Sequence, residues 1–363
     1  MWKPVEIPVN ADDLQAASVK IVAVEAGHLA AYALDADGKL YAWGTHLFGQ
    51  LGYEEEPEPV VEETEAGSGS EDLTTEQLED GDDTEEEDEE LPLAKLVVVE
   101  KVPRVVEALT GHALVKVSAG NHFVVAMSST GEVFSWGRGC FGQLGSGNTG
   151  NVTVPRRIPA LEAFVALDVA AGTGHVLGVF VAREQSQHPH QTENTVVLAW
   201  GRGRDGCLGL GGASNESLPV ENTFFRGLGA VKVAAGGDHS LVLCRASTQT
   251  FLYAFGGNRL GQLGVASPAD HIDMPTLVDE FLNVRVAAIG AGAQYSAALT
   301  GDGELFTWGD ARYGKTCRSD RRTTFVPWKV ELPNSLSPSF TTQLSVGTHH
   351  SLAQLRLRTF LLA

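Results

Sequence analysis

The 363-residue sequence lacks the features that mark secreted and membrane proteins. It has four cysteines, Cys140, Cys207, Cys244 and Cys317, which form neither a CxxC pair nor a disulfide framework. Such cysteines are typical of a reducing compartment, so we expect the protein in the cytoplasm, the nucleus or both. No uncharged apolar run approaches the length of a membrane span, and the first residues, MWKPVEIPVN, do not have the pattern of a signal peptide.

Patterns typical of catalysis are also missing. We find no serine nucleophile elbow, no pair of catalytic carboxylates and no zinc-ligand spacing. A short insertion at residues 183–194, REQSQHPHQTEN, contains His188 and His190, but this composition is more typical of a polar loop than of a metal site. We therefore expect no catalytic site, no metal, no cofactor and no membrane contact.

Basic residues are absent from one long stretch. Between Glu54 and Glu90 the sequence has twenty Asp and Glu and no Lys or Arg, and these acids account for the formal charge of −20. The rest of the chain is balanced, with 26 acidic and 26 basic side chains. Because a self-repelling segment poor in aromatics buries little surface, we interpret residues 53–92 as an acidic, disordered insertion in a single domain spanning residues 1–363.

What the sequence has in abundance is an internal repeat. Five times an aromatic strand runs into a Gly and, after four intervening residues, into a second Gly: YAWGTHLFGQLG from Tyr41, FSWGRGCFGQLG from Phe134, LAWGRGRDGCLG from Leu198, YAFGGNRLGQLG from Tyr253 and FTWGDARYGKTC from Phe306. The steps between successive copies are 93, 64, 55 and 53 residues, and the two insertions lengthen the first two steps. A basic unit of about 53 residues fits a four-stranded propeller blade.

A second signature precedes each aromatic strand, where an apolar strand ends in small residues and Gly. These glycines are Gly27, Gly120, Gly172, Gly236, Gly292 and, in a sixth copy, Gly347. Three residues beyond them stand His175, His239 and His350 in three copies, and Ala30, Phe123 and Tyr295 in the others. Because aromatics and Ala occupy the same position, we interpret these histidines as core or turn-bonding residues and not as metal ligands.

Each unit has the pattern of four antiparallel strands, a to d in chain order. Strand b alternates and leads through a short Gly-containing turn into the aromatic strand c, which indicates a hairpin. A segment with a proline closes each unit, at Pro103, Pro155, Pro219, Pro275 and Pro327. Proline in a sheet belongs at an edge, so we expect this segment to be strand d, the outermost strand of the blade.

These repeats resemble those of the regulator of chromosome condensation family, which combine a Gly-x-x-His-Ser strand, a Trp-Gly strand end and Gly-Gln-Leu-Gly. The resemblance covers nearly everything outside residues 53–95 and implies an all-β propeller of four-stranded blades. Five units are complete, and a sixth would be shared between the termini, with Lys3–Ile7 as its d strand and Ala363 at the end of its c strand. We expect six blades closed in this way; the family's usual seven are the alternative.

Two phosphate-binding patterns occur inside the repeats. Residues 309–316, GDARYGKT, match the P-loop, in which Lys315 would reach phosphates and Thr316 a magnesium ion. A P-loop needs a helix directly after it, whereas CRSDRRTTFVPWKV leads into the next d strand. The GxGxxG matches that begin at Gly137 and Gly201 likewise recur at blade spacing without helices. We interpret all of them as features of the repeat.

Antiparallel order places the a–b turn and the c–d loop of every blade on one face. We predict that this face binds a partner through His122, Asp238, Gln294 and His349 of the turns and Arg138, Arg202, Arg204, Arg259 and Arg312 of the loops. Recurrence of Arg at one register favours a docking surface, while plain solvation of exposed Arg and binding through the opposite face are the alternatives.

The resemblance implies a protein that works by binding other proteins. Some family members are exchange factors that release GDP from a Ran-type GTPase, and others are interaction modules in ubiquitin ligases, kinases and trafficking proteins. Asp238 and His349 match positions that exchange factors use, whereas Leu29, His122, Gly174 and Gln294 depart from them and no wedge hairpin follows any Trp-Gly. We expect a monomeric, non-catalytic interaction module; exchange on a Ran-like small GTPase is the alternative.

The acidic insertion bears on the class of partner. A negatively charged chain is not attracted to nucleic acid, so we expect no direct DNA binding. The insertion begins in the first c–d loop and therefore lies on the predicted face. Three roles stay open: it covers the arginines or competes with an acidic partner, it captures a basic protein, or it is a solvated loop that prevents aggregation.

Overall fold

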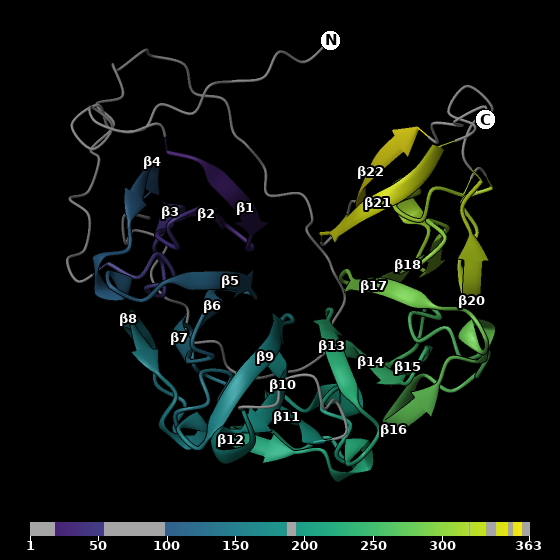
Figure 1. Ribbon diagram of the computed structural model, residues 1–363, viewed down its shortest axis with the longest axis horizontal. Helices are drawn as coiled ribbons and strands as arrows, with labels where there is room; N and C mark the ends of the chain where they lie inside the picture. Colours follow the sequence, from purple (N-terminus) through teal and green to yellow (C-terminus); the bar gives the residue numbers. More distant parts are fainter. Residues whose placement is uncertain are drawn as a thin grey trace, which may run out of the picture.

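The fold of the described residues is all-β. The computed structural model describes residues 19–53, 99–186, 194–318, 320–331, 339–347 and 351–357. They form five four-stranded antiparallel sheets and one two-stranded sheet. Figure 1 shows these sheets following one another around a central axis, with the first strand of each sheet nearest to the axis. This is the blade arrangement that the repeat predicts.

The strands of each sheet pair in chain order. Blade 1 contains β1 (Ile21–Ala26), β2 (Ala30–Asp35), β3 (Leu40–Thr45) and β4 (Val99–Val105). Blade 2 contains β5 (Leu114–Ala119), β6 (Phe123–Ser128), β7 (Val133–Gly137) and β8 (Val152–Arg157). Blade 3 contains β9 (Phe164–Ala171), β10 (His175–Ala182), β11 (Thr195–Gly201) and β12 (Glu216–Glu221).

The remaining strands continue the series. Blade 4 contains β13 (Ala230–Ala235), β14 (His239–Ala246), β15 (Gln249–Gly257) and β16 (His271–Leu277). Blade 5 contains β17 (Val286–Ala291), β18 (Tyr295–Thr300), β19 (Leu305–Gly309) and β20 (Thr324–Lys329). The two-stranded sheet pairs β21 (Ser339–Val346) with β22 (Ser351–Leu357).

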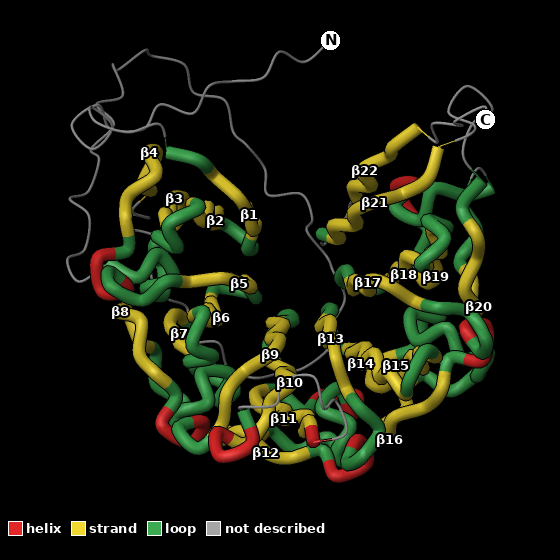
Figure 2. The backbone as a smooth tube through the Cα atoms, in the orientation of Figure 1, coloured by secondary structure: helices red, strands yellow, loops and turns green. Residues whose placement is uncertain are grey.

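The helices are short and peripheral (Figure 2). Four of them follow a d strand: η1 (Glu107–Leu109), η2 (Pro159–Leu161), η6 (Thr223–Phe225) and η7 (Asp279–Phe281). Three others lie in loops: η3 (Arg183–Gln185), η5 (Arg204–Gly206) and η8 (Arg312–Gly314). Among the described residues, no helix has the length and apolar character that crossing a bilayer requires.

The prediction that the proline segments are the outermost strands is confirmed. They form β4, β8, β12, β16 and β20, each paired only with the c strand of its blade. The register shifts within each pairing, for example between Ala42 and Gly44 in blade 1. Pro103, Pro155, Pro275 and Pro327 are nevertheless buried, because an edge position of the backbone does not require an exposed side chain.

Closure of the ring falls outside the described residues. The sheet of β21 and β22 is the a–b hairpin of the sixth unit. Both the predicted closing strand Lys3–Ile7 and the predicted end of a third strand at Ala363 lie outside, so six blades stay a prediction. Residues 54–92 and 187–193 of the two predicted insertions also lie outside the described residues. Tyr53 itself is buried in blade 1, where its hydroxyl donates to the Ala42 carbonyl, and the bounds of the insertion stay a prediction.

The apolar core lies between neighbouring blades. Four clusters each combine side chains of two successive blades, from blades 1 and 2 through blades 4 and 5. The aromatic residue at the Trp position of the repeat is fully buried in each cluster: Trp136, Trp200, Phe255 and Trp308. Burying apolar surface across every seam is what makes the repeats stack.

Trp-Gly and Gly-Gln-Leu-Gly are the two halves of a contact between blades. The indole Nε1 of Trp136, Trp200 and Trp308 donates to the backbone carbonyl of Gln50, Gln143 and Gln262 in the preceding blade, at 2.8, 3.0 and 2.9 Å. In the remaining seam, Phe255 stands in the Trp position and Cys207 in the Gln position. There the Cys207 carbonyl accepts from the hydroxyl of Ser240 at 2.7 Å.

The histidines of the Gly-x-x-His turns form a second contact between blades. Nε2 of His175 lies 2.9 Å from Oγ of Ser240, and Nε2 of His239 lies 2.8 Å from Oγ of Ser296. Each serine donates its own proton to a carbonyl, of Cys207 or Gln262, so the histidine must donate from Nε2. The prediction of buried structural histidines is therefore confirmed for these two, and His350 lies outside the described residues.

At these seams the donor His of one blade and the acceptor Ser of the following blade are present or absent together. Val124 and Val176 stand where the other blades have Ser240 and Ser296, and the facing positions in the preceding blades carry Ala30 and Phe123. An unpartnered buried polar group costs free energy, whereas an apolar pair of matching shape does not. At these four seams His occurs only where the following blade carries Ser.

Candidate partner-binding face

The a–b turn and the c–d loop of each blade are bonded to each other. The residue after the Trp-Gly position donates its backbone N–H to a turn carbonyl: Thr45 to Leu29, Arg138 to His122, Arg202 to Gly174, Gly257 to Asp238 and Asp310 to Gln294, at 2.7 to 2.9 Å. The intervening glycine makes this approach possible. Gly137 has a φ of 102°, and a Cβ there would collide with the His122 backbone. The two loops therefore form one face, as the strand order predicts.

The acidic insertion leaves the propeller from this face. β3 ends at Thr45 and β4 begins at Val99, and these two residues are register partners. The described chain stops at Tyr53 and resumes at Val99. Both ends of the insertion are thus attached near the c–d loop of blade 1.

Two predicted arginines stack on aromatic rings. The Arg138 guanidinium carbon lies 5.1 Å from the Phe48 ring centroid and 5.9 Å from that of Phe141, and Arg202 lies 5.0 Å from Phe141. We call Phe48, Arg138, Phe141 and Arg202 the Phe–Arg ladder. It crosses two seams, from blade 1 through blade 2 to blade 3.

The Gln of Gly-Gln-Leu-Gly holds both phenylalanines in place. Oε1 of Gln50 accepts from the backbone N–H of Phe48, and Oε1 of Gln143 accepts from that of Phe141, each at 2.8 Å. Both glutamines are buried. The repeat motif thus fixes the ladder as well as the seam.

His122 continues the ladder into the turn of blade 2. Its ring packs 5.0 Å from those of Phe48 and His28, and its φ of 63° is rare for a residue with a side chain. Burial, with smaller effects of nearby His28 and Arg138, lowers the pKa of His122 to about 4. His122 is therefore neutral at pH 7, and the positive charge here comes from the arginines.

The structure brings Asp238 to the end of the ladder. Its carboxylate lies 3.9 Å from the Arg202 guanidinium, and both side chains are partly exposed. Arg204 in the same loop lies 3.9 Å from Asp205. At these distances the pairs are weak.

Arg312 and Gln294 form a separate cluster in blade 5. Arg312 lies 3.0 Å from both the Asp310 carboxylate and Oε1 of Gln294. Arg259 is exposed in the c–d loop of blade 4. His349 lies outside the described residues. The predicted arginines thus do not form a uniform rim: Arg312 is already paired, while Arg138 and Arg202 are held by rings.

The P-loop match at residues 309–316 is used for packing. Lys315 is buried and its Nζ lies 2.7 Å from the buried Asp310 carboxylate. Burial alone would raise the pKa of Asp310, but hydrogen bonds from Lys315 and Arg312 outweigh it and hold this pKa below its ordinary value. A lysine committed to an internal carboxylate does not reach phosphates, which confirms the interpretation from sequence.

We expect Lys315→Met to lower the free energy of unfolding by roughly 2 kcal/mol, because the buried Asp310 carboxylate loses one of its two charged donors. Urea denaturation followed by circular dichroism measures the change. Arg312→Met is the matched control: since Arg312 is largely exposed, we expect a smaller loss. If the two variants lose the same free energy of unfolding, burial of the ion pair does not strengthen it.

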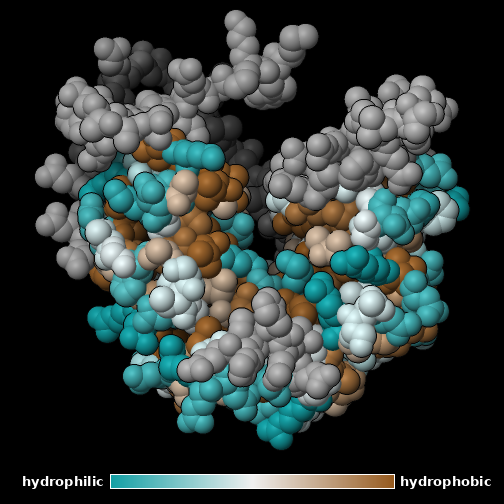
Figure 3. Space-filling view, in the orientation of Figure 1, coloured by the Kyte–Doolittle hydropathy of each residue, from teal (hydrophilic) through white to brown (hydrophobic). Residues whose placement is uncertain are grey.

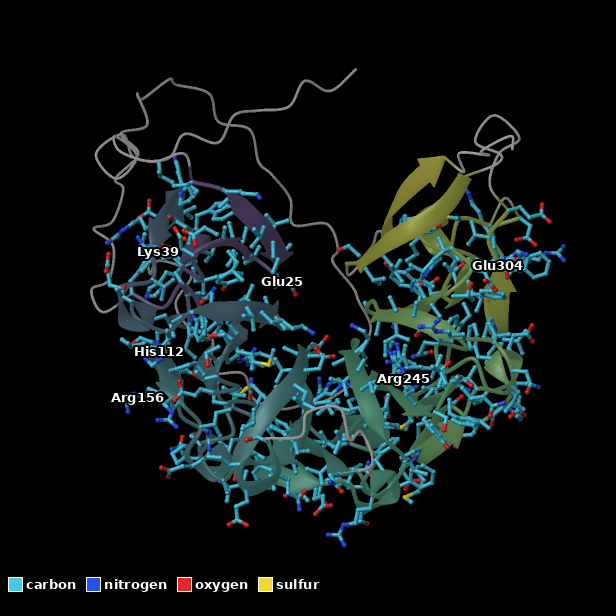
Figure 4. The ribbon with its side chains drawn as sticks, in the orientation of Figure 1. Glu25, Lys39, His112, Arg156, Arg245 and Glu304 are labelled. Carbon is cyan, nitrogen blue, oxygen red and sulfur yellow. The ribbon has the colours of Figure 1, made fainter. Side chains whose placement is uncertain are left out.

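A cavity of about 410 Å³ lies at the centre, lined by the inner ends of β1, β5, β9, β13, β17 and β21. Its wall is mostly Gly and Ala, with Glu25, Lys116 and Ser118 among the polar exceptions. The face in Figure 3 is hollowed at this centre, and Figure 4 shows Glu25 on the side of β1 that faces it. Burial raises the pKa of Glu25 to about 7, against the opposing effects of the Ala119 N–H and Lys116.

The wall charges are bound to neighbouring blades. Lys116 lies 2.5 Å from the Asp168 carboxylate, which also accepts from the Val233 backbone N–H at 3.0 Å. These contacts join blades 2, 3 and 4. Among the described residues, no group of three His, Cys, Asp or Glu side chains has the geometry of a metal site.

Comparison with known proteins decides the family. A model described as "RCC1-like domain" matches residues 3–358, which is nearly the whole chain. The protein belongs to the RCC1-like domain family. The Ultraviolet-B receptor UVR8 of Arabidopsis thaliana is 32% identical over 252 residues, which cover 69% of this chain and 53% of UVR8. The chain therefore spans about half the length of this relative.

Two solved structures share the fold. Human WBSCR16 aligns over 98% of this chain and 76% of its own, with a TM-score of 0.71 and 18% identity. Yeast RCC1 (Prp20), solved with Kap60 bound, aligns over 92% of this chain and 67% of its own, with a TM-score of 0.67 and 21% identity. At such identities the likeness establishes the propeller fold alone.

Proposed function

We propose that this RCC1-like propeller is a non-catalytic interaction module that binds a protein partner through the face of a–b turns and c–d loops. The observation that carries the proposal is the Phe–Arg ladder, in which partly exposed rings and arginines lie together across two seams. Aromatic residues and Arg are enriched at the centres of protein interfaces. Yeast RCC1 (Prp20) is itself solved as a complex with another protein, Kap60.

The face can be tested with two charge reversals in one blade. Arg259 is exposed in the c–d loop of blade 4, and Arg245 is exposed at the b–c hairpin, at the opposite end of the same blade. We expect Arg259→Glu to reduce capture of the partner from a cell extract and Arg245→Glu to leave it unchanged, as measured by quantitative mass spectrometry. The reverse order would place the partner on the opposite face and overturn the proposal.

Nucleotide exchange is the competing activity that this experiment leaves open. We expect no acceleration of the release of a fluorescent GDP analogue from Ran when the protein is added. Asp238 is the turn carboxylate that exchange would require here, and it lies beside Arg202. If the protein accelerates GDP release and the Asp238→Ala variant does not, the protein is an exchange factor and not only an interaction module. A cytoplasmic or nuclear site of action is part of the proposal, and fluorescent tagging checks it.

A further inference from the structure

The Phe–Arg ladder differs from the closely ion-paired arginines of the described chain in how its charges are held. Arg226 and Arg318 are bound to Glu221 and Asp320 at 2.6 Å, and Arg312 is bound to Asp310. Within the described residues Arg138 forms no ion pair, and its guanidinium contacts are the two Phe rings. Arg202 has only a carboxylate at 3.9 Å besides its ring.

Stacking prepares these two guanidinium groups for an anion. A ring that covers the flat face of a guanidinium leaves the N–H groups at its edge available, and a carboxylate binds that edge with two parallel hydrogen bonds. Rings also restrict the side-chain rotamers, so less entropy is lost on binding. The buried Gln50 and Gln143 hold the Phe48 and Phe141 backbones, which makes the arrangement a built feature of the repeat.

The two charges share one aromatic ring and lie close enough together for one extended chain to contact both. Both guanidinium groups lie on the same Phe141 ring, at 5.9 and 5.0 Å from its centre. Alternate side chains of an extended peptide point to the same side and lie roughly 7 Å apart. Two carboxylates separated by one residue could therefore reach Arg138 and Arg202 together, with the exposed part of Phe141 between them.

We propose that the Phe–Arg ladder binds an acidic segment of the partner protein, with carboxylates at alternate positions. The inference rests on the proposed function and adds the chemistry of the partner to it. His122 is neutral next to the ladder, so the affinity should stay constant between pH 6 and pH 8. Because the contacts are charge-assisted, affinity should fall as ionic strength rises.

Fluorescence anisotropy of the full chain with a labelled synthetic peptide of alternating Glu and Ser tests the proposal. We expect Arg138→Gln and Arg202→Gln each to weaken binding about tenfold. Phe141→Leu, which keeps both charges, should also weaken it, since the guanidinium groups lose their support. The Gln-Ser peptide is the uncharged control, and Arg245→Gln, at the opposite end of blade 4, is the charge-matched control.

Equal effects of Arg245→Gln and Arg138→Gln would overturn the proposal, because binding would then follow net charge and not the ladder. The same titrations are made on a variant lacking residues 54–91. Ladder-dependent binding that is tighter in this variant supports the site and shows that the chain's own acids compete for it. Peptide binding that does not depend on the ladder, in either the full chain or the variant lacking residues 54–91, would refute the proposed site. A captured partner that depends on Arg259 but not on the ladder would leave the proposed function standing and refute this inference alone.

Discussion

Replacing Trp200 with Ala is expected to lower the free energy of unfolding by about 4 kcal/mol. The indole is fully buried between blades 2 and 3, and it donates to the Gln143 carbonyl at 3.0 Å. The substitution leaves a cavity in the seam and a buried carbonyl without a donor, and both effects destabilise. Urea denaturation followed by circular dichroism gives the value, since the tryptophan signal itself is altered.

Two conservative variants separate the hydrogen bond from the packing. Trp200→Phe removes the donor from the Gln143 carbonyl, whereas after Trp308→Phe the Gln262 carbonyl still accepts from Ser296 at 2.8 Å. Both variants lose the same atoms from equally buried sites. We expect Trp200→Phe to cost about 1 kcal/mol more than Trp308→Phe. Similar costs would mean that the indole acts through its volume alone.

Most of the fold could be predicted from the sequence because the repeat carries both halves of each seam. Trp-Gly marks the end of a c strand. Gly-Gln-Leu-Gly marks the loop whose Gln carbonyl accepts a hydrogen bond from the Trp of the next blade. Proline identified the d strands through a backbone property, the missing N–H, which does not depend on neighbours. The missing N–H does not predict whether the proline side chain is exposed, and Pro103 is in fact buried.

The candidate face was predicted less completely, because its contacts join different units. Arg138 and Arg202 were found from their register, but Phe48 and Phe141, which hold them, were not singled out. A signal was available: Phe stands before Gly-Gln-Leu-Gly only in units 1 and 2, and the following units carry Arg after Trp-Gly. Arg312 lies two positions later than Arg138 and Arg202 in the repeat, at the register of Arg204 and Arg259, and its charge is paired with Asp310. The position of an arginine in the repeat therefore does not show whether its charge is already paired within the protein or available to a partner.

Lowering the pH from 7 to 5 should cost the propeller roughly 4 kcal/mol through two histidines. Burial is the main reason that the pKa of His175 is lowered to about 4 and that of His239 to about 3, and Arg202 acts in the same direction on His175. The unfolded chain takes up these protons near pH 6.5, while the folded chain does not. Stability from these residues is therefore complete above pH 6.5 and is lost as the pH falls toward 3.

Glu25 acts in the opposite direction and must be separated. Its folded pKa is about 7 and its ordinary value is 4.5, so its contribution is complete below the ordinary value and is lost as the pH rises through 7. Measurements in a Glu25→Gln background remove this opposing effect. The difference in unfolding free energy between pH 7 and pH 5 then reports mainly on the buried histidines.

The repeat itself supplies the variant that isolates one histidine. His239→Phe combined with Ser296→Val copies the apolar seam of Phe123 and Val176, and the Gln262 carbonyl keeps Trp308 as its donor. We expect this variant, in the Glu25→Gln background, to lose about 2 kcal/mol less between pH 7 and pH 5 than its parent. Unfolding curves at both pH values provide the test. An unchanged pH dependence would show that His239 is not the neutral, Nε2-protonated donor that its bond to Ser296 requires.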